Sequence, residues 1–130
     1  MIQIDLVRSW QEEQIVQLYR AAGWWTEEMD ASRINDLIRG SFLFAVAIDI
    51  STGRAVGMGR VISDGVADAY IQDLVVQGDR RSWGVGKMIL TTLLEECKFL
   101  DRTDSRARQG GVLWIVGICT HARTCAHALS

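Results

Sequence analysis

Several common features are absent from this chain of 130 residues, and each absence removes a class of protein. No apolar run approaches the ~20 residues that span a bilayer, and residues 1–5 lack the basic and apolar regions of a signal peptide. The three cysteines form no disulfide framework of the secreted kind, which indicates a reducing, cytoplasmic compartment. The formal net charge is only -2 and the basic residues form no stripe, so we expect neither nucleic acid nor membrane as a partner.

Proline is also missing, where an average usage of about 5% would give about 6 residues, so the expected turns depend on glycine, serine and aspartate. The remaining composition is ordinary for a globular protein, with 48% hydrophobic and 23% charged residues. There is no internal repeat and no linker. Residues 1–130 are therefore expected to form a single domain with its own core.

The N-terminal part reads as a strand followed by two helices. Residues 2–6 alternate apolar and polar side chains, as a half-buried strand does. Ser9 and Glu12 fit a capping box at the start of a helix that ends at Gly23. A second, shorter helix is expected from about Asp30 to Gly40. The apolar faces of the two helices carry Ile15, Leu18, Tyr19 and Ala22, and Ile34, Leu37 and Ile38.

The middle of the chain reads as an antiparallel meander of three strands. Apolar runs cover residues 42–48, 55–62 and 66–76, and turn residues separate them at 51–53 and 63–65. The spacing therefore predicts a mostly antiparallel sheet.

A long helix and a further strand are expected after the meander. The helix carries an apolar stripe at i+4 steps, which is typical of a helix lying on a sheet. This stripe consists of Val85, Ile89, Leu93 and Cys97. Residues 101–109 are polar, and residues 112–118 read as a strand that pairs parallel to the earlier one after a crossover. The fold class is thus α/β (α+β), with a mixed, mostly antiparallel central sheet flanked by helices.

The segment 70–90 is the most informative part of the sequence. An apolar strand leads into a short basic turn with glycines, and a helix follows at once. Free N–H groups at a helix N-terminus, with the positive end of its dipole, form an anion site. Gly84 and Gly86 let the main chain approach a phosphate, and Arg80, Arg81 and Lys87 add positive charge. These residues predict a phosphate-bearing cofactor, although a plain helix start with solvated arginines is the alternative. A Rossmann-type site does not fit the glycine spacing.

The order of the expected helices and strands over residues 2–118, together with the sequence of this turn, resembles the GNAT superfamily of acyl-CoA-dependent N-acetyltransferases. The cofactor motif of that family stands here as Arg81-Ser82-Trp83-Gly84-Val85-Gly86, after the strand 71–76. The resemblance implies acetyl-CoA as co-substrate, with its pyrophosphate on the N–H groups of residues 81–87 and its pantetheine arm along residues 74–76. A backbone N–H near Leu74 would polarise the acetyl carbonyl. The implied cofactor-binding residues are Leu74, Val75, Val76, Arg81, Ser82, Trp83, Gly84, Val85, Gly86 and Lys87.

The resemblance also implies direct attack by an amine, so a group must take the proton of the ammonium form. Gln72 stands where several relatives carry a glutamate, and a glutamine holds a water but is no base. Tyr70 would orient that water, and Asp73 is the nearest carboxylate. Strand alternation puts Tyr70, Gln72 and Leu74 on one side and residues 71, 73 and 75 on the other. We expect a water relay, with Tyr70, Gln72 and Asp73 as candidate catalytic residues and no metal.

The C-terminus departs from the family pattern. Relatives continue with a helix, an aromatic pair and a closing hairpin, whereas this chain has no tyrosine after Tyr70. Residues 119–130 show neither helical nor strand period, which suggests a truncation or a reading-frame shift upstream of about Cys119. A sheet without its last elements exposes an edge, so a homodimer is expected. Gly78 replaces a proline of the family turn.

Some residues keep two interpretations. Trp24 and Trp25 either line an acceptor site or pack over the core, and the acidic residues 27, 28 and 30 either attract a cationic amine or are solvated. The cysteines and histidines at positions 119, 121, 125 and 127 do not have common zinc spacing, and Cys97 reads as a core residue. The sequence as a whole predicts an N-acetyltransferase that acts on a small-molecule or peptide amine. The alternatives are a truncated or degenerate relative that binds CoA or a partner without catalysis, and a non-catalytic phosphate-binding domain.

Overall fold

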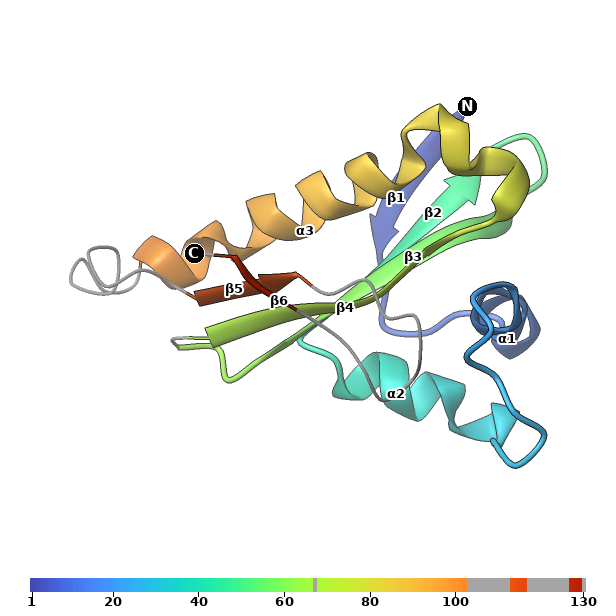
Figure 1. Ribbon diagram of the computed structural model, residues 1–130, viewed down its shortest axis with the longest axis horizontal. Coiled ribbons are helices and arrows are strands. Elements are labelled where there is room, and N and C mark those ends of the chain that lie inside the picture. Colours follow the sequence, from blue (N-terminus) through green and yellow to red (C-terminus); the bar gives the residue numbers. More distant parts are fainter. Residues whose placement is uncertain (67, 103–112, 117–126, 130) are drawn as a thin grey trace.

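The computed structural model describes residues 1–66, 68–102, 113–116 and 127–129, and its elements form one layered unit (Figure 1). In chain order the elements are β1 (Ile2–Leu6), α1 (Glu12–Ala21), the 3-10 helix η1 (Ala31–Arg33), α2 (Ile34–Gly40), β2 (Leu43–Asp49), β3 (Arg54–Ser63), β4 (Asp68–Val76), the 3-10 helix η2 (Gly78–Trp83), α3 (Val85–Arg102), β5 (Leu113–Val116) and β6 (His127–Leu129). The described strands lie in sequence order in one sheet, and among them only β4 and β5 run parallel. The predicted fold class is confirmed.

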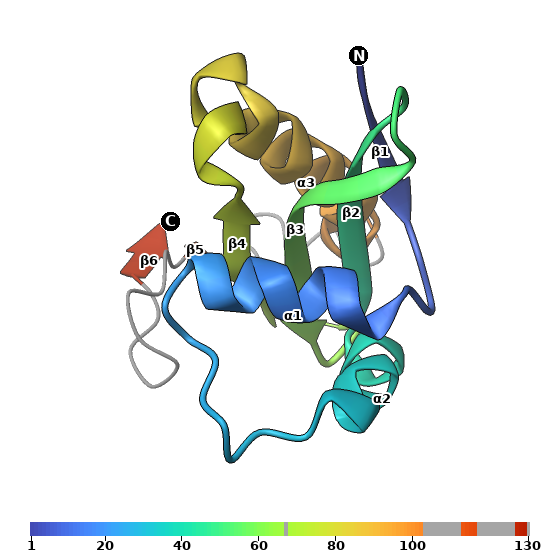
Figure 2. The ribbon, with the colours of Figure 1, turned by 90° about the vertical axis from the view of Figure 1, so that its right-hand side faces the viewer.

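The helices lie on both faces of the sheet, with α3 on one face and α1 and α2 on the other (Figures 1 and 2). Two apolar clusters fill the two interfaces. The cluster under α3 includes Ala45, Val61, Ile71, Val85, Ile89, Leu93 and Cys97. The cluster under α1 and α2 includes Ile15, Leu18, Tyr19, Trp24, Ile34, Ile38, Phe44, Val46, Met58 and Val75. No helix in the described part of the chain is long and apolar enough to cross a membrane.

The predicted stripe on α3 is confirmed, because all four of its residues are fully buried. The helix approaches β3 closely at Gly59. A Cβ at this position would lie 2.9 Å from Ile89 Cγ2 and 3.2 Å from the Cδ1 atoms of Leu74 and Leu93. Absence of a side chain at residue 59 therefore allows the contact between helix and sheet.

The first two helical segments lie where the sequence predicts them, but the start of the first one differs from its prediction. The capping box is wrong: α1 begins at Glu12 after an extended Gln11, with no side-chain cap. The chain is held here by another contact, since the Trp10 N–H donates to Asn35 Oδ1 at 2.9 Å. The second helical segment matches its prediction, with Asp30 accepting from the Ser32 N–H before η1 and α2.

The C-terminal strand was predicted correctly as a parallel neighbour of β4, and β5 pairs with it from Asp68–Leu113 to Ile71–Val116. Residues 119–130 show no strand period in the sequence, yet His127–Leu129 form β6, which pairs antiparallel with β5. The polar segment 101–109 beyond Arg102, the cysteines at 119 and 125, and the proposed truncation near residue 119 lie outside the described residues.

Candidate active site along β4

A bulge in β4 is the main irregularity of the sheet. Met58 pairs with Val75, but Arg60 pairs with Gln72, so two residues of β4 lie opposite the single residue Gly59. Asp73 adopts the left-handed conformation, with φ +56°. This is uncommon for a residue with a Cβ, although aspartate tolerates it better than most, and bulges often re-aim side chains.

The bulge changes which side chains share a face. Gln72 and Asp73 both line a cavity on the side of α1 and α2, whereas Leu74 packs with Ile71 against α3. The predicted alternation is therefore wrong beyond Gln72, because the extra residue shifts the strand by one position. Val75 lies on the α1 side, opposite to Ile71.

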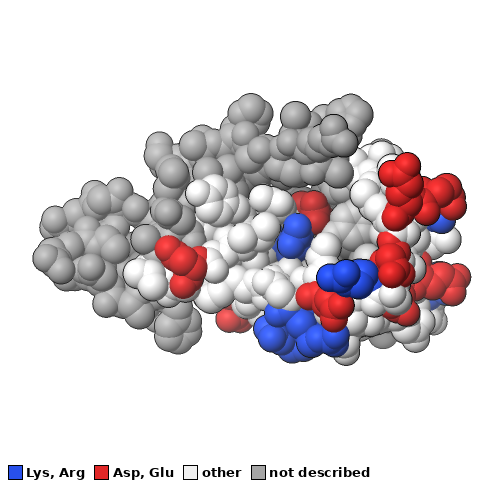
Figure 3. Space-filling model, turned by 90° about the horizontal axis from the view of Figure 1, so that it is seen from below, with Lys and Arg blue, Asp and Glu red and all other residues white. Residues whose placement is uncertain are grey.

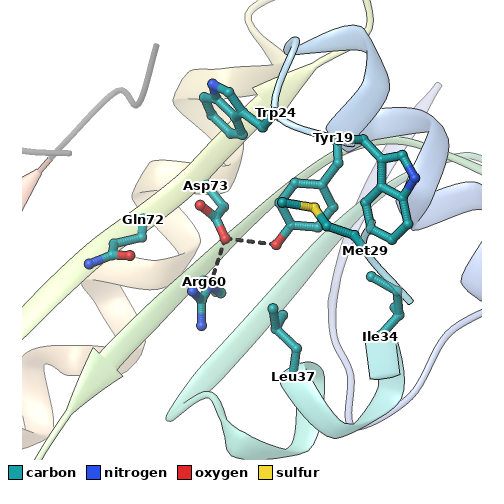
Figure 4. Close-up of a pocket in the computed structure, with 9 residues that line it drawn as sticks. Tyr19, Trp24, Met29, Ile34, Leu37, Arg60, Gln72 and Asp73 are labelled. Carbon is teal, nitrogen blue, oxygen red and sulfur yellow. Dashed lines mark hydrogen bonds and ion pairs between the residues drawn. The ribbon is translucent and has the colours of Figure 1, made fainter. Parts of the chain in front are cut away.

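Asp73 is held by two donors on one oxygen (Figure 4). Its Oδ2 accepts from the Tyr19 hydroxyl at 2.7 Å and from Arg60 Nε at 2.7 Å. The Arg60–Asp73 side chains are 17% and 13% exposed, so the ion pair is largely shielded from water. Arg60 Nη1 also donates to Ser41 Oγ at 3.4 Å. Burial and the neighbouring charge of Asp73 raise the pKa of Tyr19 strongly, so its hydroxyl stays protonated and acts as a donor.

The cavity beside this network has a volume of about 200 Å³. Its lining comprises Tyr19, Trp24, Trp25, Met29, Ile34, Leu37, Arg60, Gln72 and Asp73. The rings of Trp24 and Trp25 lie 6.3 and 6.4 Å from that of Tyr19. Trp24 is only 5% exposed, so it both packs in the core and lines the cavity. On this face of the molecule, charged side chains of both signs gather mainly toward the end formed by α1, and uncharged atoms occupy most of the centre (Figure 3).

The glycine turn follows β4 directly. The chain forms η2, passes through Gly84 at φ +74°, and enters α3 at Val85. The helical hydrogen bond at this end runs from the Met88 N–H to Gly84 O at 3.1 Å, and the first-turn N–H groups before it have no acceptor within the helix. A Cβ at Gly86 would lie 3.6 Å from Val76 Cγ2, an ordinary contact, so the protein's own packing does not require glycine there.

Arg80 has a structural partner that the sequence did not indicate. Its Nη1 lies 2.7 Å from Asp49 Oδ2, and both side chains are largely buried, at 18% and 7% exposed. Asp49 also accepts from the Ser51 hydroxyl at 2.7 Å. These bonds, Ser51 first and Arg80 second, lower the pKa of Asp49 to about 2. Arg80 therefore joins the glycine turn to the turn after β2, rather than offering an unpaired charge to a phosphate.

The structure brings the predicted site residues together only in part. Gln72 and Asp73 share the cavity, while Tyr70 is half-buried on β4 and does not line it. Residues 74–76 lead from the bulge to the turn, Gly84 ends the turn, and Gly86 and the exposed Lys87 lie in the first turn of α3. Arg81, Ser82 and Trp83 belong to η2, and the structure describes only their main chain.

Sequence reasoning missed Tyr19 and Arg60 as site residues. Arg60 carried a usable signal, because it is the one charged residue in the otherwise apolar run 55–62. A charge in a buried strand indicates a partner. Tyr19 carried no such signal, since its position matched an ordinary core residue of α1.

Comparison with known proteins agrees with this geometry. The sequence profile described as the Acetyltransferase (GNAT) family matches residues 5–106. No curated protein matches the chain.

Several solved structures share the fold. A GNAT-family acetyltransferase from Streptococcus pneumoniae TIGR4 is 26% identical over 75% of this chain and 69% of its own, with a TM-score of 0.63. Aminoglycoside 6'-N-acetyltransferase in complex with coenzyme A is 21% identical over 88% of this chain and 61% of its own, with a TM-score of 0.64. Glucosamine-6-phosphate N-acetyltransferase from Arabidopsis thaliana is 14% identical over 92% of this chain and 83% of its own, with a TM-score of 0.62. The profile match covers most of the chain, and the chain belongs to the GNAT family of acetyltransferases.

Proposed function

We propose that the protein transfers an acetyl group from acetyl-CoA to a primary amine by direct attack. The observation that carries this proposal is the arrangement along β4: a bulge with an adjoining cavity in the strand, and a glycine turn at its C-terminal end. The cavity would hold the acceptor and the turn would hold the phosphates. The CoA complex of aminoglycoside 6'-N-acetyltransferase supports the choice of cofactor.

The backbone of the turn fits a pyrophosphate. The N–H groups at the start of α3 are aligned with the positive end of the helix dipole, and Gly86 leaves space where a side chain would otherwise stand. Lys87 is exposed on the same turn. Residues 81–83 and Val85 would add main-chain N–H donors to the pyrophosphate or contacts with CoA. The described pairing of β4 with β5 ends at Ile71–Val116, so residues 74–76 are our candidates for pairing with the pantetheine arm.

The chain's own residues would position the amine and guide its proton. The thioester supplies an activated acetyl group, and the Leu74 N–H at the bulge would stabilise charge on its carbonyl oxygen. Gln72 would hold a water beside the amine, with Tyr70 orienting that water from further along β4. Asp73 Oδ2 already accepts from Tyr19 and Arg60, which leaves Oδ1 to accept from this water or from the ammonium. The amine nitrogen would bond to the acetyl carbon, the thioester C–S bond would break, and CoA would leave as the thiolate and take up a proton from water. The reaction would then depend mainly on positioning. The cytoplasmic location and the homodimer stay predictions from the sequence.

Calorimetric titration with acetyl-CoA, and with ATP as control, tests the cofactor site. We expect selective binding of acetyl-CoA. Gly86→Ala should weaken it by about tenfold or more, or about 1.4 kcal/mol, because the added methyl group stands where the phosphate approaches. The variant should fold at least as well as the wild type, since alanine favours a helix more than glycine by roughly 1 kcal/mol.

Gly40→Ala is the matched control, because Gly40 lies at the end of α2 and no atom stands within 4 Å of the place that the new methyl group would occupy. Release of CoA with an amine panel then tests the reaction. Equal acetyl-CoA binding by Gly86→Ala and wild type would remove the glycine turn as the cofactor site. Equal binding of ATP and acetyl-CoA would favour a phosphate-binding domain without specificity for CoA. Selective binding without turnover of any amine would favour a non-catalytic relative.

A further inference from the structure

We propose that the acceptor is a small primary amine carrying one compact apolar group, preferably an aromatic ring, and not a polycation or a sugar. This inference rests on the proposed function and names the substrate class for the cavity beside β4. It follows from three independent properties of the cavity: its size, the chemistry of its walls and its charge.

The size of the cavity limits the acceptor to about one ring. Sites for drug-sized ligands have volumes of roughly 300–1,000 Å³, whereas this cavity has about 200 Å³. An apolar protein cavity of about 150 Å³ is large enough for a benzene molecule. A single six-membered ring with a short chain therefore fits inside this cavity. A molecule of several sugar rings would extend beyond it, toward a neighbouring cavity of about 450 Å³ that shares Trp25, Met29, Ile34 and Leu37.

The walls of the cavity are apolar on the side of the helices. Six side chains contribute this surface, three of them aromatic: Tyr19, Trp24, Trp25, Met29, Ile34 and Leu37. Aromatic rings and a methionine sulfur favour contact with another ring. Few of these groups offer a partner to sugar hydroxyls, which would lose hydrogen bonds with water on entry.

The polar groups of the cavity lie together on the sheet side. Figure 4 shows Arg60, Gln72 and Asp73 grouped on one side of the cavity, opposite Met29, Ile34 and Leu37. Asp73 belongs to the bulge that also carries Leu74, where the acetyl group is proposed to sit, and Gln72 directly precedes this bulge. An acceptor with one polar end and one apolar end matches this division, with its nitrogen at the bulge and its ring toward α1 and α2.

The charge of the cavity argues against a polycation. Arg60 neutralises Asp73 at 2.7 Å, so the lining residues that the structure describes carry no net charge to compensate a second or third ammonium group. Of the acidic residues in the loop after α1, none lines this cavity, and Glu27 is 91% exposed and paired with Arg20 at 3.7 Å. Asp30 lines the neighbouring cavity, where Arg33 pairs with Asp36 at 3.2 Å. Transfer into such an apolar site lowers the pKa of an amine, which favours the neutral form needed for attack.

Binding and turnover of 2-phenylethylamine test the inference, with spermidine, ethanolamine and glucosamine as comparisons. Quenching of tryptophan fluorescence reports binding without any need for acetyl transfer, because Trp24 and Trp25 line the cavity. We expect 2-phenylethylamine to bind, and to have a kcat/KM about tenfold or more above each comparison amine.

Two substitutions of Leu37 locate the binding. Leu37→Asp places a charge in the apolar wall and should lower affinity for 2-phenylethylamine by about tenfold or more. Leu37→Phe keeps the wall apolar but reduces the volume, so it should lower affinity for 2-phenylethylamine more than for propylamine. Ile50→Asp is the matched control, because it makes a similar change at a 49% exposed residue of a turn away from the cavity. Thermal unfolding of each variant shows whether it is folded.

The outcomes separate this inference from the proposed function. Faster acetylation of spermidine or glucosamine than of 2-phenylethylamine would overturn the inference and leave the acetyltransferase intact. Binding of 2-phenylethylamine that responds to Leu37 but without acetylation of any amine would support the ligand class and overturn the reaction. Binding unchanged in both folded Leu37 variants would show that the amine lies elsewhere, and would overturn the inference.

Discussion

Replacing Asp73 with alanine tests whether side-chain contacts hold the bulge in β4. The change removes the acceptor for the Tyr19 hydroxyl and the ion-pair partner of Arg60, each 2.7 Å from Asp73 Oδ2. It also leaves an alanine at φ +56°, in a backbone region that aspartate tolerates better. The free energy of unfolding should therefore fall for three separate reasons.

The expected loss follows from these three contributions. The Tyr19 residue is 8% exposed, and leaving its hydroxyl without an acceptor costs about 1–3 kcal/mol. The pair of Arg60 with Asp73, at 17% and 13% exposure, lies between surface and fully buried pairs, so breaking it costs about 1–2 kcal/mol. The left-handed alanine adds up to about 1 kcal/mol. We expect a total of about 2–6 kcal/mol, a large part of the ~5–15 kcal/mol typical of a domain.

Urea unfolding followed by circular dichroism measures this loss. Asp73→Asn keeps the tolerance for the left-handed backbone and one acceptor oxygen, so it should lose only about half as much. In a double-mutant cycle, Tyr19→Phe removes the hydroxyl beforehand, and the two changes together should cost at least about 1 kcal/mol less than their sum. A loss below about 1 kcal/mol for Asp73→Ala, or strict additivity with Tyr19→Phe, would refute the assigned network.

Three further predictions concern the helix–sheet contact at Gly59, the ion pair of Asp49 and the buried Cys97. Gly59→Ala should lower the free energy of unfolding by about 1–3 kcal/mol, because its Cβ would lie 2.9 Å from Ile89 Cγ2. Gly40→Ala should not lower it, since no atom stands within 4 Å of the new methyl group. Urea unfolding of both variants checks this. The pKa of Asp49 is lowered to about 2 in the folded protein, so its contribution to stability is present above about pH 4 and is lost as the pH falls toward 2. The difference in Tm between wild type and Asp49→Asn should therefore shrink over that interval. A constant difference would contradict the prediction. Burial raises the pKa of Cys97 to about 11, so iodoacetamide at pH 8 should modify it only after unfolding, as peptide mass spectrometry would show.

The elements that sequence predicted best are those in which periodicity reports burial directly. The i+4 stripe of α3 and the three apolar runs of the meander both depend on one face meeting the core. The structure buries the whole stripe and most of the runs, except at Phe42, Ile62 and Val66 near the ends of the runs. The glycine turn was also predictable, because a left-handed residue before a helix favours glycine, and Gly84 has that conformation.

The features that sequence did not predict depend on partners far away in the chain. The capping box at Ser9 is wrong because α1 begins only at Glu12, and the chain before it is held by Asn35, which accepts from the Trp10 N–H, a contact between residues 25 positions apart. Arg80 was assigned to a phosphate from its place in the turn, yet it pairs with Asp49, 31 residues away. A local pattern shows which groups need partners, but the fold decides which partner each group meets.

The bulge shows the same limit at the site itself. Strand alternation assigns faces only while each residue has one opposite it, and a single extra residue reverses every assignment after it. Nothing in residues 70–76 distinguishes a regular strand from one with an extra residue. The reversal places Leu74 under α3 and leaves Asp73 beside Tyr19, 54 residues earlier in the chain.

Gly59 connects the two faces of the sheet at this point. It is the residue opposite the bulge, and the space that its side chain would fill is taken by Leu74, whose Cδ1 lies 3.2 Å from the Cβ position, and by Ile89 of α3. A side chain at residue 59 would therefore displace Leu74 and, through the main chain, the neighbouring Asp73 and the N–H proposed to stabilise the acetyl carbonyl. A substitution on the α3 side of the sheet should thus lower kcat on the α1 side. Gly59→Ala with unchanged turnover, despite the expected loss of stability, would mean that the bulge is set by Tyr19 and Arg60 alone.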